Sequence, residues 1–369
     1  MELSHSKVSA ELSVAIASFA TSTDTDTSFS LRSQRMLPAK MRQDLLRGLF
    51  DSDLSADSTP NFTYTNREGD SSTTQHVALN ECVVCTALKQ SACELSIQLL
   101  SFLRELLRTS FIVNSTTQIS IKRISMTKEN NIFDEILLSS AFKSFELQSC
   151  QLQKVDISSL DVNEKVLFFV NVYNTLTVHA SMRSWPGNGL YDRQSFMRCS
   201  KYNIGGYYFS LLDIEHGILR ASSSKPMVFG PFTAAMGFKD KDPKKVFTLQ
   251  VPKPFVSFAL FTISVSSPAL AVLRDIKDID HELEKLAQQF ITEYVRLNVE
   301  KKVIYLPEIF RVYWKDFGSK NENIRSEVIK KIYKYSSKNF STALKALIDG
   351  NVKPSISFDV HDWSPQLIL

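Results

Sequence analysis

The sequence predicts an α+β protein: a helix-rich single globular domain around a small sheet, with a disordered N-terminal tail. Three observations predict this class. Beyond residue 130, helical periodicity is interrupted by short hydrophobic or aromatic runs that are typical of strands. Residues 1–80 contain the low-complexity patches "TSTDTDTS" and "DSSTTQ", and such a segment buries too little apolar surface to offset its ordering entropy. With 369 residues, 43% of them hydrophobic, the chain can build one large domain.

The composition argues against several classes of protein. A formal net charge of +4 is small for this length, so it does not indicate binding to nucleic acid or to an acidic membrane. The longest apolar stretch, residues 255–265, is interrupted by serines and is too short to cross a bilayer. The first residues lack the basic leader and apolar core of a secretory signal. The five cysteines are an odd number without the spacing of a disulfide framework, so we expect a cytoplasmic protein.

Two helices are expected before the main domain. Within residues 37–50, Met41, Leu45 and Leu49 recur at helical spacing. This helix is expected to dock back on the main domain, to bind a partner, or to be only marginally ordered. Residues 86–112 repeat apolar side chains at alternating steps of four and three, the seam of a coiled coil. Further leucines widen that stripe, so we favour packing on a core over a dimeric zipper.

The main domain is expected to span residues 130–350, with residues 351–369 as a C-terminal extension. Its expected elements are one or two helices at 132–153, a helix at 164–183, a hairpin and a helix at 202–220, a strand at 255–265, a helix at about 280–297, the strand "VIYL" at 303–306, and helices to about 347.

The stretch "YNIGGYYFSLLDIEHGILR", residues 202–220, combines a turn, a helix start and a Glu–His dipeptide. Gly205 and Gly206 separate two strand-like runs, and both can take positive φ, which predicts a hairpin. Ser210 and Asp213 have the spacing of a capping box. They predict that the rest of the stretch is a helix.

On a helical wheel, Glu215 falls inside the apolar arc of this helix, while His216 and Arg220 lie on the other side. A carboxylate that faces a core must be paired or hydrogen-bonded, because burying it alone costs several kcal/mol. We therefore expect a structural carboxylate, satisfied by backbone amides or a buried arginine, or a site carboxylate, unless the phase of the helix differs from that of the wheel. Gly217 weakens a helix, which indicates that another group approaches the backbone there.

The helix at 164–183 is apolar on every side, which is typical of a buried helix. It nevertheless carries Asn171 and Asn174, which lie three residues apart and are therefore adjacent on its surface. Buried amides need several hydrogen bonds. We expect these asparagines either to hold neighbouring backbone or to line a polar cleft. His179, by itself, is interpreted as a satisfied core histidine.

Motifs of other sites are absent or weak. The sequence has no GxxxxGK[ST] loop, no HExxH and no GxGxxG, and we expect no cofactor and no metal. Cys82 and Cys85 form "CVVC". Redox chemistry prefers this motif at the start of a helix that follows a strand, and the upstream residues here resemble tail.

Three motifs occur in the order that resembles the family named domain of unknown function 547: "LQKVDISSLDVNEKVLFFVNVYNTLTVHA", "YNIGGYYFSLLDIEHGILR" and "VSFALFTISVSSPAL". The resemblance covers roughly residues 133–350 and is strongest at 151–220. It implies an α+β fold related to papain-like or transglutaminase-like proteins. The positions that match the family are Asn171, Tyr173, Asn174, His179, Gly205, Gly206, Glu215, His216 and Arg220.

The chain departs from the family pattern where many bacterial members carry cysteines. After the "FAL" segment these members have Asn-Cys-Gly, where this chain has Phe261-Thr262-Ile263. Soon after, they have Ser-Cys-Pro, where it has Ser266-Ser267-Pro268. A threonine hydroxyl does not replace a thiolate without a dedicated base. The resemblance therefore implies a polar cleft without the family nucleophile.

These observations lead to competing functions. We favour a noncatalytic interaction or scaffold module with an unidentified protein partner, contacted through the helices at 37–50 and 86–112. The alternative is a hydrolase or acyl-transferase in which His216 is the base, Ser266 or Ser267 the nucleophile, and the two asparagines the orienting groups. A redox function through the "CVVC" motif ranks last. We expect no nucleic-acid or membrane partner, and the sequence does not predict the oligomeric state.

Overall fold

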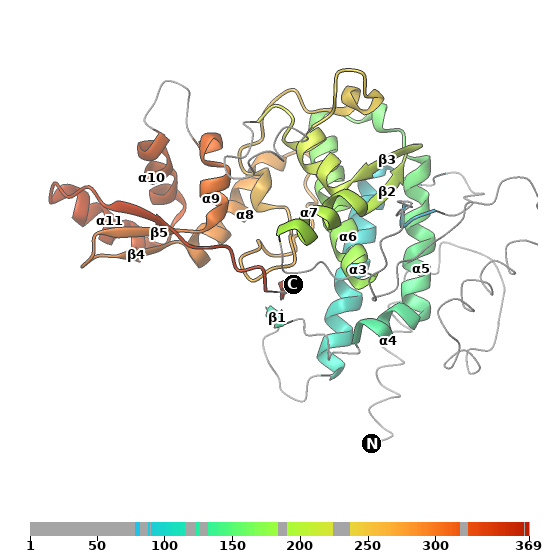
Figure 1. The fold of residues 1–369 in the computed structure, drawn as a ribbon, viewed down its shortest axis with the longest axis horizontal. Helices are drawn as coiled ribbons and strands as arrows, with labels where there is room; N and C mark the ends of the chain where they lie inside the picture. The colour runs from blue at the N-terminus through green and yellow to red at the C-terminus, as the bar shows by residue number, and fades with distance from the viewer. Residues whose placement is uncertain are drawn as a thin grey trace, which may run out of the picture. The chain divides into compact units, whose positions relative to one another are not determined.

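The computed structural model describes residues 78–81, 88, 90–114, 123–125, 132–183, 190–223, 237–317, 324–364 and 366–368. By internal contacts the chain divides into residues 1–75 and 76–369, and every described residue belongs to the second unit. The predicted helix at 37–50, and the predicted tail as far as residue 77, lie outside the described residues. In the described part, helices predominate and the strands form small separate sheets (Figure 1). This unit is an α+β domain, as the sequence predicts.

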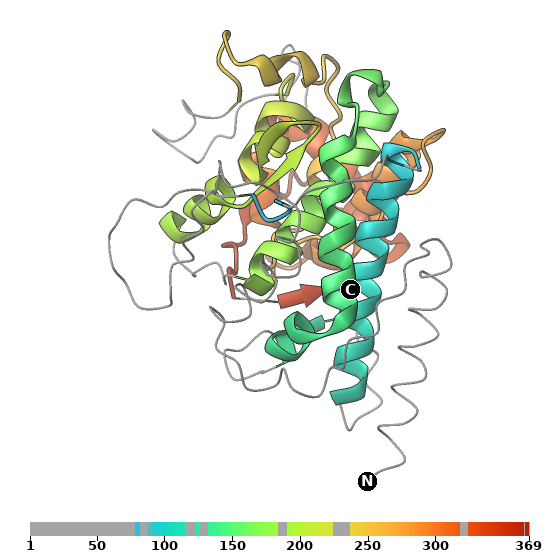
Figure 2. The ribbon, with the colours of Figure 1, turned by 90° about the vertical axis from the view of Figure 1, so that its right-hand side faces the viewer.

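Helix α3 (Ala92–Asn114) packs against α5 (Ser140–Ser149) and α6 (Val162–Arg183), and Figure 2 shows α3 running beside α5. The helix starts later than predicted, after a capping box between Ser91 and Glu94. Its apolar stripe is covered by this chain, so it is not open to a zipper partner. The buried members of the stripe are Leu95, Leu99, Leu100, Phe102, Leu103, Leu106 and Leu107.

Helix α6 is the central element of the domain. Asp161 and Glu164 start it, since each carboxylate accepts a hydrogen bond from the backbone N–H of the other residue at 2.8 Å. Every residue from Val166 to Met182 is buried. The all-round apolarity of the sequence therefore predicts the burial correctly.

The predicted hairpin forms from β2 (Lys201–Ile204) and β3 (Tyr207–Ser210), which pair antiparallel. Gly205 and Gly206 make the turn with φ of +57° and +85°. A Cβ on Gly205 would lie 2.5 Å from the carbonyl oxygen of Val155, so the turn also needs glycine for its close approach to that backbone.

Residues at the end of the predicted tail are part of the core. Ala78 and Asn80 are buried. The Asn80 amide donates to the carbonyls of Ser149 (3.1 Å) and Asn203 (2.8 Å), and its oxygen accepts from the Asn203 N–H at 2.7 Å. This side chain joins the end of α5 to the hairpin.

The predicted strand at 255–265 is wrong. Val256–Phe258 form the 3-10 turn η8, and the residues around it are irregular. The backbone of this segment is paired with a side chain instead of a neighbouring strand. Asn174 donates to the carbonyl of Ala259 and accepts from the N–H of Phe261, both at 2.9 Å.

The two asparagines of α6 hold the irregular segment over a longer stretch. Asn174 also donates to the carbonyl of Ala271 at 3.2 Å. Asn171 bonds both backbone groups of Leu273, each at 2.9 Å. Because buried backbone groups must be paired, these amides take the place of a sheet neighbour. The asparagines hold neighbouring backbone, the first of their two predicted roles.

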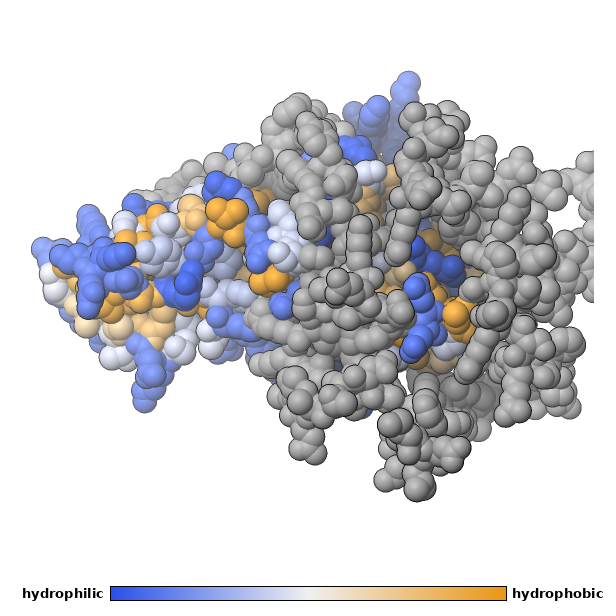
Figure 3. Space-filling view, turned by 60° about the horizontal axis from the view of Figure 1, so that its bottom comes forward, coloured by the Kyte–Doolittle hydropathy of each residue, from blue (hydrophilic) through white to orange (hydrophobic). Residues whose placement is uncertain are grey.

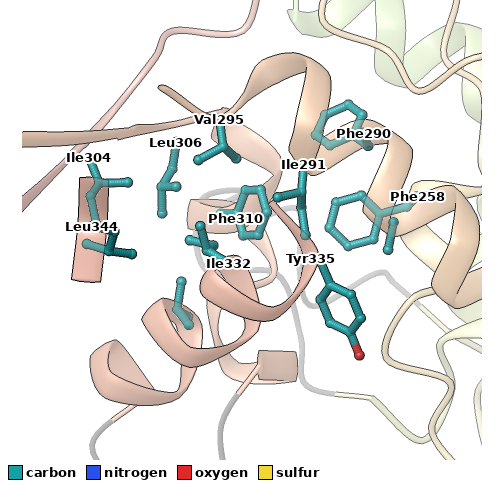
Figure 4. Close-up of a cluster of buried hydrophobic side chains, with 12 residues drawn as sticks. Phe258, Phe290, Ile291, Val295, Ile304, Leu306, Phe310, Ile332, Tyr335 and Leu344 are labelled. Atoms are coloured by element: carbon teal, nitrogen blue, oxygen red, sulfur yellow. The ribbon is translucent and has the colours of Figure 1, made fainter. Parts of the chain in front are cut away.

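The C-terminal half combines helices with a three-stranded sheet of order β4-β5-β6. Strand β4 (Arg296–Asn298) is antiparallel to β5 (Val303–Leu306), and β6 (Ser355–Phe358) is parallel to it. Figure 4 shows the apolar cluster of this half, in which Phe258, Phe290, Phe310, Ile332 and Leu344 meet. The helices of this half are α8 (Ile279–Tyr294), α9 (Glu308–Val312), α10 (Ile324–Tyr335) and α11 (Lys338–Asp349).

The predicted C-terminal extension is built into the fold. Besides β6, it contributes β7 (Gln366–Ile368), which pairs antiparallel with β1 (Arg123–Ser125).

Hydrophilic and hydrophobic residues are mixed on the surface at the end that carries α11 and β4 (Figure 3). In the described part of the chain, no helix combines the length and apolar character that a membrane span needs. The shorter remaining elements are α4 (Ile132–Leu138), α7 (Leu190–Cys199), η3 (Cys150–Lys154), η4 (Ile157–Ser159), η7 (Pro243–Phe247) and η9 (Trp314–Phe317).

Candidate functional site

The helix after the hairpin is a π-helix, η5 (Asp213–Leu219), and not the predicted α-helix. The N–H of Arg220 donates to the carbonyl of Glu215, five residues back, at 2.8 Å. The predicted capping box is present: Ser210 and Asp213 exchange two hydrogen bonds of 3.0 Å. The wider turn also explains why His216 and Arg220 are buried together with Glu215, which the α-helical wheel did not predict.

Gly217 is needed in this turn because an aromatic ring lies against it. A Cβ at that position would be 2.6 Å from the nearest ring atom of Phe238. The predicted close approach to the backbone is confirmed.

The carboxylate of Glu215 is buried and accepts from two tyrosines. The side chain is 6% exposed in relative terms. Tyr313 donates to Oε1 at 2.5 Å and Tyr173 donates to Oε2 at 3.1 Å. Burial, and then the charge of Glu215, raise the pKa of both hydroxyls well above the ordinary tyrosine value. Both tyrosines therefore remain protonated donors at neutral pH.

Arg220 extends this network on the other side of Tyr313. Its guanidinium pairs with Asp316 at 2.6 Å and donates to the hydroxyl oxygen of Ser257 at 2.6 Å. Both charged side chains of the pair are buried. The two charges are therefore balanced within the core, where an isolated charge would be costly.

His216 contributes a buried imidazole beside Glu215. Its Nε2 lies 3.7 Å from Oε1 of that residue. Burial lowers the pKa of His216; the Glu215 charge opposes this shift, and the Arg220 charge adds to it. Among the described residues, no hydroxyl or thiol hydrogen-bonds to this ring. The nucleophile that the hydrolase hypothesis pairs with His216 is not at hydrogen-bonding distance.

His179 is buried in the core, as predicted, but only one of its two ring nitrogens has a hydrogen-bond partner among the described residues. Its Nδ1 lies 2.9 Å from the hydroxyl of Tyr202. The ring is completely buried, and burial lowers its pKa to about 3. It is therefore neutral at physiological pH.

The loop that carries the predicted nucleophile positions is closely packed. Ser267 is completely buried, and its hydroxyl accepts from the Thr262 N–H at 2.9 Å and donates to the Pro268 carbonyl at 2.8 Å. Ser266 accepts from the N–H of Asp362 at 3.0 Å. Both hydroxyls therefore hold backbone groups.

A residue that sequence reasoning missed lies against this loop. His361, from the C-terminal segment, has Nε2 2.9 Å from the hydroxyl of Ser264. The preceding Ile263 has φ of +49°, an unusual conformation for a β-branched residue. Arg193 of α7 holds this arrangement by donating to the carbonyls of Ile263 and Trp363.

Residues 157–291 match the family model described as "Protein of unknown function, DUF547". This segment is a DUF547 domain. No curated protein and no solved structure matched the chain. The expected kinship with papain-like or transglutaminase-like proteins therefore stays a prediction.

The DUF547 segment does not contain the whole polar network. Glu215 and Arg220 lie inside it, whereas their partners Tyr313 and Asp316 lie downstream. His361 also lies outside it. The sequence indicates that a buried carboxylate needs donors, but no local pattern selects a tyrosine that is 98 positions away.

The described residues offer no metal centre. No group of three or more histidine, cysteine, aspartate or glutamate side chains is placed to hold an ion in that part of the chain. Cys150 is disulfide-bonded, which the number and spacing of the cysteines did not predict. Cys93 is a buried thiol whose pKa is raised to about 12, chiefly by burial. Cys82 and Cys85 of the "CVVC" motif lie outside the described residues.

Proposed function

We propose that this DUF547 protein is a noncatalytic interaction module built on an enzyme-like arrangement of residues. The observation that carries the proposal is the state of Glu215. Its two oxygens accept from Tyr313 and Tyr173 in a buried site. A carboxylate held in this way stabilises the fold, whereas a general acid or base must be within reach of substrate.

The loop at 262–267 supports the same proposal. Thr262 and Ser267 stand where the resemblance to the family implies thiols. The C-terminal segment covers this loop: the Val265 N–H donates to the Ser364 carbonyl at 3.0 Å, beside the Asp362–Ser266 bond. A substrate would have to displace these contacts.

A hydrolase or acyl-transferase is the second candidate, and one contact favours it. The Ser264 hydroxyl lies 2.9 Å from Nε2 of His361. Burial lowers the pKa of His361 to about 4, so the ring is neutral at pH 7 and can accept a proton. However, Ser264 is completely buried. The noncatalytic function is therefore favoured.

A screen of the full chain with activated esters, thioesters, amides and a fluorophosphonate probe tests the proposal. We expect no turnover and no covalent labelling. The control variants are His216→Ala and His361→Ala, one for each candidate base. The noncatalytic function is contradicted if the full chain turns over a substrate, if deletion of residues 1–75 leaves this activity intact, and if one of the two substitutions abolishes it. The substitution that abolishes the activity then identifies the base.

We further propose that the module acts in the cytoplasm on a protein partner. The buried Cys93 thiol is compatible with a reducing compartment, whereas the disulfide of Cys150 is more usual outside one. Imaging of a fluorescent fusion shows in which of the two kinds of compartment the protein lies. Accumulation in a secretory compartment contradicts the proposed location.

A further inference from the structure

Residues 359–364, here named the C-terminal strap, run from β6 towards β7 along the loop at 262–267 (Figure 1). Two backbone hydrogen bonds join the segments. The N–H of Val265 donates to the carbonyl of Ser364 at 3.0 Å, and the N–H of Ser266 donates to that of Asp362 at 3.4 Å. The strap belongs to no helix or sheet. It therefore lies on the loop as a peptide lies on a sheet edge to which it adds.

The side chains of the strap alternate between the fold and solvent. Three are half-buried, and we call their places the inward positions: Asp359, His361 and Trp363. The other three are exposed and occupy the outward positions: Val360, Asp362 and Ser364. A period of two is that of an extended chain. In recognition of extended peptides, alternate side chains give the specificity while the backbone gives affinity.

The first two inward positions have separate polar partners. The Asp359 carboxylate accepts from the guanidinium of Arg296 with both oxygens, at 2.9 and 2.8 Å. Nε2 of His361 lies 2.9 Å from the hydroxyl of Ser264. The backbone N–H of His361 donates to the Glu308 carboxylate at 2.9 Å. The fold thus provides a cation for an acidic residue and a hydroxyl for a histidine two residues later.

The third inward position is aromatic. The ring centroid of Trp363 lies 5.3 Å from the guanidinium carbon of Arg193 and 3.9 Å from the ring centroid of His361. Arg193 also donates to the carbonyl of Trp363 at 2.9 Å. Together the three inward positions fit an acidic residue, a histidine and a tryptophan, each separated from the next by one residue.

The loop under the strap keeps its shape through contacts that the strap does not make. Arg193 donates to the carbonyls of Thr262 and Ile263, at 3.1 and 3.3 Å. The hydroxyl of Tyr294, on α8, donates to the carbonyl of Ser267 at 3.2 Å. The surface on which the strap lies therefore remains in place when the strap leaves it.

The strap itself is held by contacts near solvent. None of its six residues is buried. The side chains of the Arg296–Asp359 pair are 65% and 36% exposed, and an exposed ion pair contributes little to stability. A hollow of about 190 Å³, lined among others by Tyr294, Pro307 and Val360, lies beside the first strap residues. The strap therefore neither fills its groove nor is locked into it by a core side chain.

We propose that the loop at 262–267, with Arg193 and Arg296, is a groove for an extended segment of a partner protein, and that the strap occupies it until this partner displaces the strap. The partner segment carries an acidic residue, a histidine and a tryptophan at alternate positions. The proposal names the partner class of the noncatalytic module and rests on that proposed function. Because the strap competes, the apparent affinity for the partner falls with the fraction of chains in which the groove is open.

Fluorescence anisotropy with the full chain tests the groove. The probe is a fluorescein-labelled peptide with the sequence of residues 358–364, FDVHDWS. The variant Asp359→Ala/Trp363→Ala loosens the strap and leaves the groove intact. It should bind the probe about tenfold more tightly than the unmodified chain, since each exposed contact that it removes contributes about one-half of a tenfold step. The control Val360→Ala/Ser364→Ala changes two outward positions and should bind as the unmodified chain does.

Two matched probes test which side chains are recognised. One has alanine at the three inward positions, and the other has alanine at the three outward positions. Each keeps one aspartate, so they do not differ in the number of carboxylates. We expect the loosened variant to bind the second probe as it binds the parent probe, and not to bind the first. Adding Arg296→Gln to the loosened variant should weaken the parent probe about threefold but leave a probe without the Asp359 carboxylate unchanged.

Several results overturn the proposal. Equal binding of the two matched probes shows that alternate side chains are not recognised, and no binding of the parent probe to the loosened variant shows that there is no groove. Light scattering that finds the unmodified chain dimeric and the loosened variant monomeric assigns the groove to the strap of a second copy. Turnover by the loosened variant in the substrate screen contradicts the noncatalytic function, whereas absent binding without turnover contradicts the groove alone.

Discussion

The guanidinium carbon of Arg220 lies 3.6 Å from the centroid of the Tyr313 ring, and the hydroxyl of the same tyrosine donates to Glu215. One aromatic side chain thus contacts both the buried cation and the buried anion. The Asp316 carboxylate completes the set by pairing with Arg220. Groups that share partners in this way act together, so the loss of one member affects the others.

Replacement of Tyr313 by phenylalanine should destabilise the domain. Tyr313→Phe keeps the ring over Arg220 but removes one of two donors to a buried carboxylate, which costs about 2 kcal/mol. Urea unfolding measures the change. Tyr333→Phe, at an exposed tyrosine of α10, is the matched control and should have little effect. Equal stability of both variants would show that Glu215 does not depend on this hydroxyl.

Loss of the Asn174 amide should loosen the segment that follows η8. Asn174→Ala leaves the carbonyls of Ala259 and Ala271 and the N–H of Phe261 without this partner. We expect a loss of about 3 kcal/mol in the free energy of unfolding, roughly 1 kcal/mol for each bond. Faster amide hydrogen exchange should be confined at first to residues 259–273. Gln288→Ala, on the exposed side of α8, is the control.

The stability of the domain should fall in acid because of His361. Burial, assisted by Arg193, lowers the pKa of His361 to about 4, while Glu308 and Asp362 oppose that shift. The unfolded chain, with a histidine pKa of about 6.5, therefore binds more protons between these values. Stability is complete above about pH 6.5 and is lost as the pH falls towards 4.

Urea unfolding at pH 7.5 and pH 5 measures this effect. Between pH 7.5 and pH 5, the free energy of unfolding should fall by about 2 kcal/mol less in His361→Gln than in the unmodified chain. The reason is that pH 5 lies 1.5 units below the histidine pKa of the unfolded chain, and each unit corresponds to about 1.4 kcal/mol. His179, with a pKa of about 3, contributes a similar loss in both proteins and cancels in the comparison. An identical pH dependence in the variant would argue against a buried neutral His361.

Gly217→Ala should destabilise the π-turn despite the better helix propensity of alanine. The added Cβ would lie 2.6 Å from the Phe238 ring, so the ring or the turn must shift, at a cost of about 1–3 kcal/mol. Thermal unfolding measures the loss. The double variant Gly217→Ala/Phe238→Leu makes room and should recover part of it; if it recovers nothing, the ring contact is not the cause.

The sequence by itself determined the parts of the domain that depend only on residues close to one another along the chain. The span of α6, the hairpin at Gly205 and Gly206, and the capping box at Ser210 all follow from periodicity, allowed φ and short-range hydrogen bonds. Burial of Glu215 could also be predicted, because its position among apolar residues is a local property.

Only the tertiary structure decided which groups satisfy the buried polar atoms. The apolar run at 255–265 predicts burial equally well as a strand or as an irregular segment, and Asn171 and Asn174 provide the hydrogen bonds that make the irregular form stable. Tyr313, Asp316 and His361 likewise reach their partners through packing between segments far apart in the chain. Local patterns show that a buried charge needs a donor, but the donor is selected by the folded geometry.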